Sequence, residues 1–195
     1  IEKAQKQLSP KKLRPYQESA VVSASADLKE RNRALIYLAT GLGKTVVAGR
    51  IIQKMFNDRP DSKVLVIAHM VDLVEQLQRA LWSDIPISVP SQIIDGSNKP
   101  EQLDGLTIAT DKAAAEYIST GFRPDFLVID ECHHVSDKNL YSKIISQLSD
   151  IPILGVTATP WRGDGYEIEN TFGAPSHVCG IEKGLKQGYL APVNY

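Results

Sequence analysis

The stretch ATGLGKT, at residues 39–45, decides the fold of this 195-residue chain. It follows the apolar run RALIYLA at 33–39, which has the length and composition of a buried strand. The amphipathic run 44–56 follows it with helical spacing. Two glycines separated by one residue interrupt both patterns and predict a tight turn. A strand, a glycine turn and a helix in this order begin a βαβ unit.

The residue types in this turn point to phosphate binding. Glycines allow backbone N–H groups to turn inward, and a helix that begins near Lys44 directs its positive end at the same anion. Lys44 would reach the β and γ phosphates of a nucleotide, and the hydroxyl of Thr45 would hold Mg²⁺. Leu38 departs from the full P-loop pattern, where a first glycine is expected. A plain glycine turn is the alternative. The expected phosphate-binding residues are Thr40, Gly41, Leu42, Gly43, Lys44 and Thr45.

A second signal is the run FLVIDE at 126–131, an apolar strand that ends in two carboxylates. A P-loop ATPase needs one acid at a strand end to hold the Mg²⁺ shell, and Asp130 would supply it. It also needs a group that orients or deprotonates the attacking water, and Glu131 would do this. Taken alone, the pair could be a solvated acidic loop. Together with the glycine turn, it predicts an ATP site in which Lys44, Asp130 and Glu131 are catalytic.

Apolar and amphipathic runs alternate along the chain, which is typical of an α/β fold with a mostly parallel central sheet and helices on both faces. Strands are expected at 33–39, 63–68, 91–95, 106–110, 126–129, 153–156 and 177–179. Helices are expected at 15–32, 44–56, 71–82, 112–118, 140–148 and 182–187. After residue 160 the chain is glycine-rich, and a loop is expected through residue 175.

The composition excludes several classes of protein. The chain has 22 Lys and Arg against 23 Asp and Glu, so it is not a wholly basic protein that coats nucleic acid. It has no apolar run of about 18 residues, so no transmembrane segment and no membrane partner are expected. Two cysteines without a CxxC pattern favour a reducing, cytoplasmic compartment. The chain begins at Ile1 rather than Met, so we expect a fragment of a longer protein.

With these motifs in place, DECH at 130–133 completes a DExH box, and the chain resembles the N-terminal RecA-like motor domain of superfamily 2 helicases and translocases. The resemblance implies a RecA-like P-loop NTPase fold, the cofactors ATP and Mg²⁺, and a nucleic-acid partner. The flank TATPWRGDG at 157–165 is similar to excision-repair helicases and the motor subunits of restriction enzymes, which favours DNA. DECH also occurs in RNA sensors, so RNA remains an alternative. The other matching motifs are LRPYQ at 13–17, AHM at 68–70, TIAT at 107–110 and GVTATP at 155–160.

The resemblance also implies roles beyond the phosphate loop. Gln17 would read the edge of adenine, because a carboxamide can donate and accept at once. Arg14 would stack on adenine or contact phosphate. The alternative for both is an ordinary helix start on the surface. His133 would contact Thr157 and Thr159 and couple the nucleotide state to movement of a second motor domain, unless it merely caps a strand end.

Nucleic-acid contacts are implied for His69 and Thr110, which would reach the phosphate backbone of one strand. Arg162 would contribute a phosphate or nucleic-acid contact. The alternative for Thr110 is that its hydroxyl caps the next helix. A zinc site is a further alternative, because the chain has five soft or borderline ligands: Cys132, His133, His134, His177 and Cys179.

Three parts follow from the resemblance. Residues 1–32 would carry the adenine-recognition element, residues 33–180 would form the ATP-binding core, and residues 181–195 would lead toward a second RecA-like domain. Because this family hydrolyses ATP at the cleft between two such domains, these residues alone are expected to bind nucleotide weakly and to be nearly inactive. A nucleotide-dependent binding or scaffold module without turnover is the alternative function, although the retained Lys44, Asp130 and Glu131 argue against it.

Overall fold

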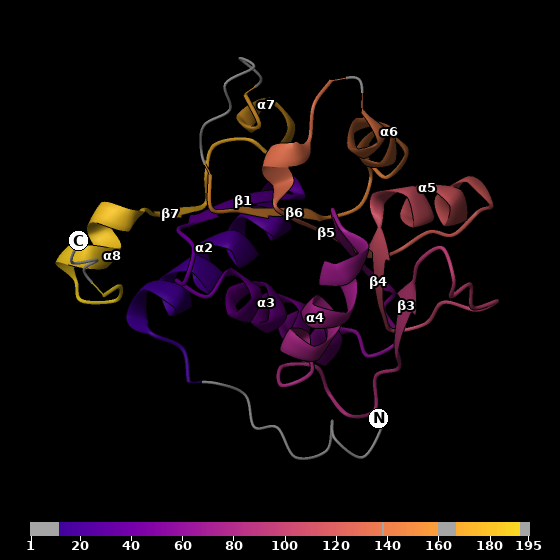
Figure 1. Cartoon of the computed structure of the whole chain (residues 1–195), viewed down its shortest axis with the longest axis horizontal. Coiled ribbons are helices and arrows are strands. Elements are labelled where there is room, and N and C mark those ends of the chain that lie inside the picture. The colour runs from indigo at the N-terminus through magenta and orange to yellow at the C-terminus, as the bar shows by residue number, and fades with distance from the viewer. Residues whose placement is uncertain (1–11, 138, 160–166, 192–195) are drawn as a thin grey trace.

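The computed structural model describes residues 12–137, 139–159 and 167–191. Within them, a sheet of seven parallel strands has the order β3-β4-β2-β5-β6-β1-β7 (Figure 1). The strands are β1 (Arg33–Leu38), β2 (Val64–Ala68), β3 (Ser91–Ile94), β4 (Leu106–Thr110), β5 (Phe126–Asp130), β6 (Ile153–Thr157) and β7 (His177–Cys179).

Helices cover both faces of the sheet. On one face lie α2 (Pro15–Arg31), α3 (Lys44–Asp58) and α4 (Val71–Leu81), and on the other lie α5 (Asp111–Ser119), α6 (Leu140–Gln147) and α7 (Glu169–Phe172) (Figure 1). A 3₁₀ turn, η1 (Cys132–His134), follows β5. Helix α8 (Ile181–Lys186) lies beyond the β7 edge of the sheet (Figure 1). Among the described residues, no helix has both the length and the apolar character needed to cross a bilayer.

The central strands are apolar throughout because each face of the sheet has its own core. In β1, Ile36 and Leu38 belong to the core under α2 and α3, whereas Leu35 and Tyr37 belong to the core on the opposite face. Full burial of an apolar side chain such as Leu35 contributes about 1.5–3 kcal/mol to the stability of the fold. The uninterrupted apolar runs in the sequence are therefore the expected signature of strands that are covered on both sides.

This topology gathers the motifs at one edge. In a parallel sheet all carboxyl ends lie together, and β1, β6, β5 and β2 are successive neighbours. The register places Asp130 of β5 beside Val156 of β6, and Tyr37 of β1 beside Thr157 of β6. The glycine turn after β1, the two acids at the end of β5 and Thr157 are thus neighbours. Ligands in open α/β sheets bind at this kind of edge.

The expected strands and helices agree with the observed bounds to within two residues at each end. One prediction was wrong: the stretch 160–175 was expected to be loop throughout, yet α7 forms at Glu169–Phe172. The side chain of Phe172 is fully buried and lies against Gly155, where an added Cβ would come within 2.8 Å of the ring. A single short turn is therefore fixed by burial of one aromatic side chain rather than by helical periodicity.

Candidate functional site

The turn between β1 and α3 has the backbone geometry that its glycines predict. Gly41 and Gly43 have φ angles of +84° and +82°, a region that side chains with a Cβ seldom adopt. Between them, Leu42 is fully buried, and its N–H donates to the carbonyl of Ala39 at 3.0 Å. Helix α3 begins at Lys44, so the unpaired N–H groups of its first turn lie at the loop. This arrangement suits the binding of an anion.

Two side chains from the first turn of α2 hold this loop in place. The hydroxyl of Tyr16 and Nε2 of Gln17 both donate to the carbonyl of Leu42, at 2.8 and 3.0 Å. Oε1 of Gln17 accepts from the backbone N–H of Arg14 at 2.9 Å. A carboxamide has a second N–H and a second lone pair, so Gln17 retains the capacity to bond a base. Tyr16 was not among the site residues predicted from the sequence, although it lies between Arg14 and Gln17, which were.

Beside the loop lies a pocket of about 340 Å³. Its walls combine the start of α2 with the glycine turn, so it adjoins the place predicted for phosphates. The lining residues are Lys12, Arg14, Tyr16, Gln17, Gly41, Gly43 and Val46.

Lys44 and Glu131 face each other across the site. Nζ of Lys44 lies 3.2 Å from Oε1 of Glu131, and both side chains are largely shielded from solvent. Glu131 has a φ of +48°, an unusual backbone conformation for a residue with a side chain. Such conformations concentrate at functional sites, where the surrounding fold holds them in place. The predicted phosphate-binding lysine and the predicted catalytic base are thus within ion-pair distance.

Asp130 ends β5 in a setting that favours a cation. Burial raises the pKa of Asp130, and the neighbouring Glu131 carboxylate raises it further, whereas a backbone hydrogen bond from Glu131 and the charges of Lys44 and His69 lower it. A nearby divalent cation would stabilise the ionised form. Among the described residues, no group of three or more His, Cys, Asp or Glu side chains could hold a metal. A Mg²⁺ ion is commonly held by one or two protein oxygens together with waters and substrate phosphates. Asp130 and the Thr45 hydroxyl are donors of this kind.

His133 joins Glu131 to the end of β6. Its Nδ1 lies 2.8 Å from Oγ1 of Thr157 and 3.3 Å from Oε2 of Glu131. Thr157 is fully buried, and its hydroxyl lies 3.5 Å from Oε2 of Glu131. The N–H of Thr159 donates to the same hydroxyl at 3.1 Å. The expected contact between His133 and Thr157 is therefore present, and Thr159 joins the network through its backbone.

Three imidazole rings form a row at this edge of the sheet. His69, which follows β2, stacks on His134 with ring centroids 4.4 Å apart. His134 in turn lies 4.2 Å from the ring of His133. The row connects the residue expected to contact nucleic acid with the Glu131 network. His134 was not selected as part of the nucleic-acid or coupling site, because the motif ends at the first of the two histidines.

Two other candidates for nucleic-acid contact differ from His69. The hydroxyl of Thr110 accepts the N–H of Ala113 at 3.3 Å and caps α5, and the side chain is nearly buried. The geometry therefore shows the capping role that was considered as the alternative. Arg162 lies outside the described residues.

The zinc alternative is not supported by the positions of the cysteines. Cys132 belongs to the core on the face covered by α5 and α6, whereas Cys179 belongs to the core on the opposite face. Burial raises the pKa of both thiols, which disfavours the thiolate that a metal requires. The two side chains are buried core residues on opposite sides of the sheet and cannot share an ion.

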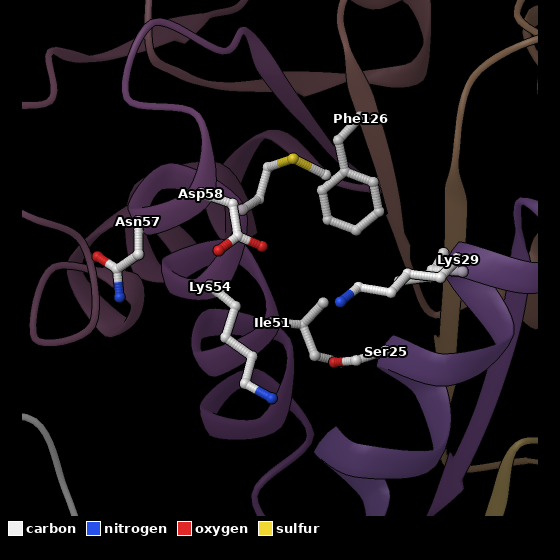
Figure 2. A pocket seen from close by; sticks show the side chains of 9 residues that line it. Ser25, Lys29, Ile51, Lys54, Asn57, Asp58 and Phe126 are labelled. Carbon is white, nitrogen blue, oxygen red and sulfur yellow. The ribbon is translucent and has the colours of Figure 1, made fainter.

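A second hollow, of about 310 Å³, opens between α2 and α3, and Lys29 and Asp58 reach toward it (Figure 2). It is lined in part by Phe126, the first residue of β5, whereas Asp130 is the last. The hollow therefore lies at the amino ends of the strands, where α2 and α3 both end. Helix C-termini carry partial negative charge and, unlike helix N-termini, offer no free N–H groups to a phosphate.

Comparison with known proteins agrees with this geometry. The family described as "Type III restriction enzyme, res subunit" matches residues 10–162. The chain belongs to this family. It is 30% identical over 196 residues to the type I restriction enzyme EcoAI endonuclease subunit of Escherichia coli, covering 94% of this chain and 24% of that protein. It is 36% identical over 155 residues to the DNA 3′-5′ translocase XPB2 of Sulfurisphaera tokodaii, covering 78% of this chain and 32% of that protein.

Solved structures share the fold. The Pyrococcus furiosus Hef helicase domain matches with a TM-score of 0.78 at 21% identity, over 94% of this chain and 42% of that one. A nuclease-deletion mutant of the type ISP restriction-modification enzyme LlaGI, in complex with a DNA substrate mimic, matches with a TM-score of 0.74 at 22% identity, over 91% of this chain and 21% of that one. The fold is that of a RecA-like helicase domain. The chain spans about a quarter to a third of the two curated relatives above.

Proposed function

We propose that this chain is the ATP-binding motor domain of a nucleic-acid-dependent ATPase, a helicase or translocase that uses Mg·ATP. The observation that carries the proposal is the convergence of the glycine loop, the ion pair between Lys44 and Glu131, and the contact between His133 and Thr157 at one sheet edge. Membership of a restriction-enzyme family and likeness to a DNA translocase support it.

In this proposal the loop N–H groups and Lys44 bind the β and γ phosphates, while Thr45 and Asp130 hold Mg²⁺. When bound, Mg²⁺ neutralises charge that develops on the phosphate oxygens. The γ phosphate competes with Glu131 for Lys44, and the carboxylate that is released accepts a proton from the attacking water. The water oxygen bonds to the γ phosphorus, the bond to the bridging oxygen breaks, and ADP leaves.

The proposed function also couples the nucleotide state to movement of a second motor domain. A second RecA-like domain, outside these residues, would complete the cleft and stabilise the transferring phosphoryl group. The contacts of Glu131 with His133 and Thr157 give the water-activating group a direct connection to the end of β6. A change in the position of Glu131 when nucleotide binds would therefore alter its contact with Thr157, whose hydroxyl also bonds to the backbone of Thr159.

We favour DNA as the nucleic acid, because the relatives named above are a restriction-enzyme subunit and a DNA translocase. Among the described candidates for nucleic-acid contact, we favour His69 over Thr110, because His69 is partly exposed at the carboxyl edge of the sheet and Thr110 is buried. RNA is the second candidate, favoured by 26% identity over 190 residues to the mouse ATP-dependent RNA helicase DHX58.

The test is the ATPase rate of the full-length protein with duplex DNA, single-stranded DNA and RNA. The three nucleic acids are compared at the same concentration of nucleotide residues. The proposal expects a rate that rises with nucleic acid and rises most with DNA. A larger rise with RNA would overturn the preference for DNA. A rate that none of the three increases would instead support the scaffold alternative, in which nucleotide is bound without nucleic-acid-dependent turnover.

A further inference from the structure

The segment after α8 turns back onto the phosphate loop. The N–H groups of Tyr189 and Leu190 both donate to the carbonyl of Gly184, at 2.8 and 3.1 Å, which closes this turn. Leu190 then lies between two glycines: an added Cβ would be 3.4 Å from its side chain at Gly41 and 2.8 Å at Gly184. Residues 184–190 are therefore packed directly against the loop expected to hold phosphate.

Tyr189 contacts two residues that line the pocket beside the phosphate loop, Arg14 and Tyr16. The centroid of its ring lies 4.5 Å from the centroid of the Tyr16 ring. The guanidinium carbon of Arg14 lies 5.8 Å from the Tyr189 ring centroid, within range of a cation–π interaction. Nη1 of Arg14 also donates to the backbone carbonyl of Tyr189 at 3.2 Å. One residue near the end of the described chain thus holds two residues near its start.

Arg14 and Tyr16 line the pocket beside the phosphate loop, and Tyr189 does not. Tyr189 would therefore act on a base in this pocket through Arg14 and Tyr16. An arginine side chain loses considerable rotamer freedom when it is fixed on a ligand. A guanidinium that is already held by a ring and a carbonyl loses less on binding, so preorganisation increases affinity.

We propose that Tyr189 is a positioning residue for base recognition, which holds Arg14 at the wall of the pocket where the base of the nucleotide binds. This rests on the proposed function, because it assumes that the pocket takes the base of ATP. It goes beyond that function by assigning base affinity to the segment that follows α8. Leu190 of the same segment packs against Gly41 of the phosphate loop, so one segment supports both the loop and, through Tyr189, the side chain of Arg14.

The test compares two ligands on the full-length protein, Mg·ATP and inorganic tripolyphosphate with Mg²⁺, by isothermal titration calorimetry. Tripolyphosphate has the phosphates but no base. Tyr189→Ala is expected to weaken ATP about fivefold, the size of one exposed cation–π contact, and to leave tripolyphosphate within about twofold. Tyr189→Phe keeps the ring and is expected to match the wild type for both ligands.

Arg14→Ala supplies the second arm. If Tyr189 acts through Arg14, Arg14→Ala also weakens ATP selectively, and the double variant is little worse than Arg14→Ala alone. Equal losses for ATP and tripolyphosphate in Tyr189→Ala would show a general structural role and overturn the proposal, as would unchanged ATP affinity. A wild-type protein that binds neither ligand would instead contradict the proposed function itself.

Discussion

Nδ1 of His133 lies 2.8 Å from Oγ1 of Thr157, and this contact bridges the ends of β5 and β6. The two strands are paired in register, with Asp130 beside Val156, so the residues that follow each strand meet at the same edge. Both partners also lie near Oε2 of Glu131, at 3.3 and 3.5 Å. The carboxylate expected to activate water is therefore oriented from two strands at once.

Removing the Thr157 hydroxyl tests this orientation. Thr157→Val in the full-length protein is expected to lower nucleic-acid-stimulated ATP turnover about fivefold to tenfold. One hydrogen bond contributes about 1 kcal/mol, and its loss leaves a buried partner without a hydrogen bond. The affinity for ATP should change little, because the Thr157 hydroxyl contacts His133 and Glu131 rather than the glycine turn or Lys44. Thr157→Ser keeps the hydroxyl and should retain most turnover. Equal activity of the Val and Ser variants would contradict the role of the contact.

Lys44 provides the sharpest test of phosphate binding. Lys44→Ala is expected to weaken the binding of ATP more than tenfold, because a charged hydrogen bond to phosphate contributes about 1.5–3 kcal/mol to the binding free energy. The measurement is the rise in Tm with added Mg·ATP, which a bound ligand produces by mass action. Lys54→Ala is the matched control, since Lys54 is an exposed lysine in the last turns of the same helix. An undiminished rise for Lys44→Ala would exclude Lys44 from the site.

Gly43 should not tolerate a side chain. Gly43→Ala combines a φ of +82° with a Cβ that would come within 2.5 Å of Nε2 of Gln17. The strain is expected to cost about 1–2 kcal/mol of stability and to displace the Gln17 bond to the loop, so both Tm and ATP affinity should fall. Gly96→Ala has no atom within 4 Å of the new Cβ and serves as the control. Equal Tm values for the two variants would refute the close fit.

The raised pKa of Asp130 predicts a pH-dependent stability effect. A carboxyl whose pKa is raised on folding costs stability once it is ionised, and this cost vanishes at a pH below its ordinary pKa. Asp130→Asn is therefore expected to raise Tm at pH 7 in EDTA and to lose that gain in acid. The same variant should lose the response to Mg²⁺. A Tm gain that is equal at both pH values would contradict burial of the charge as its cause.

Patterns within single elements and short motifs predicted most of the fold and selected residues that lie together at the centre of the candidate site. Gly41, Gly43, Lys44 and the two acids at the end of β5 belong to short motifs whose chemistry depends on local spacing. Contacts between distant segments were not predictable in this way: Arg14 and Tyr189 are 175 residues apart, and no periodicity connects them. The roles of Tyr16 and His134 were missed for the same reason, since each depends on a neighbour from another element.

In the proposed function, this domain hydrolyses ATP with Glu131 as the group that activates water. The most direct measurement compares wild-type and Glu131→Gln full-length protein for nucleic-acid-stimulated ATP turnover and, in parallel, for the Kd of Mg·ATP. The amide cannot take the proton, so turnover should fall by about 100-fold or more. The Kd should stay the same or decrease, because Lys44 no longer pairs with a carboxylate. Undiminished turnover in the Gln variant would show that Glu131 does not activate the attacking water.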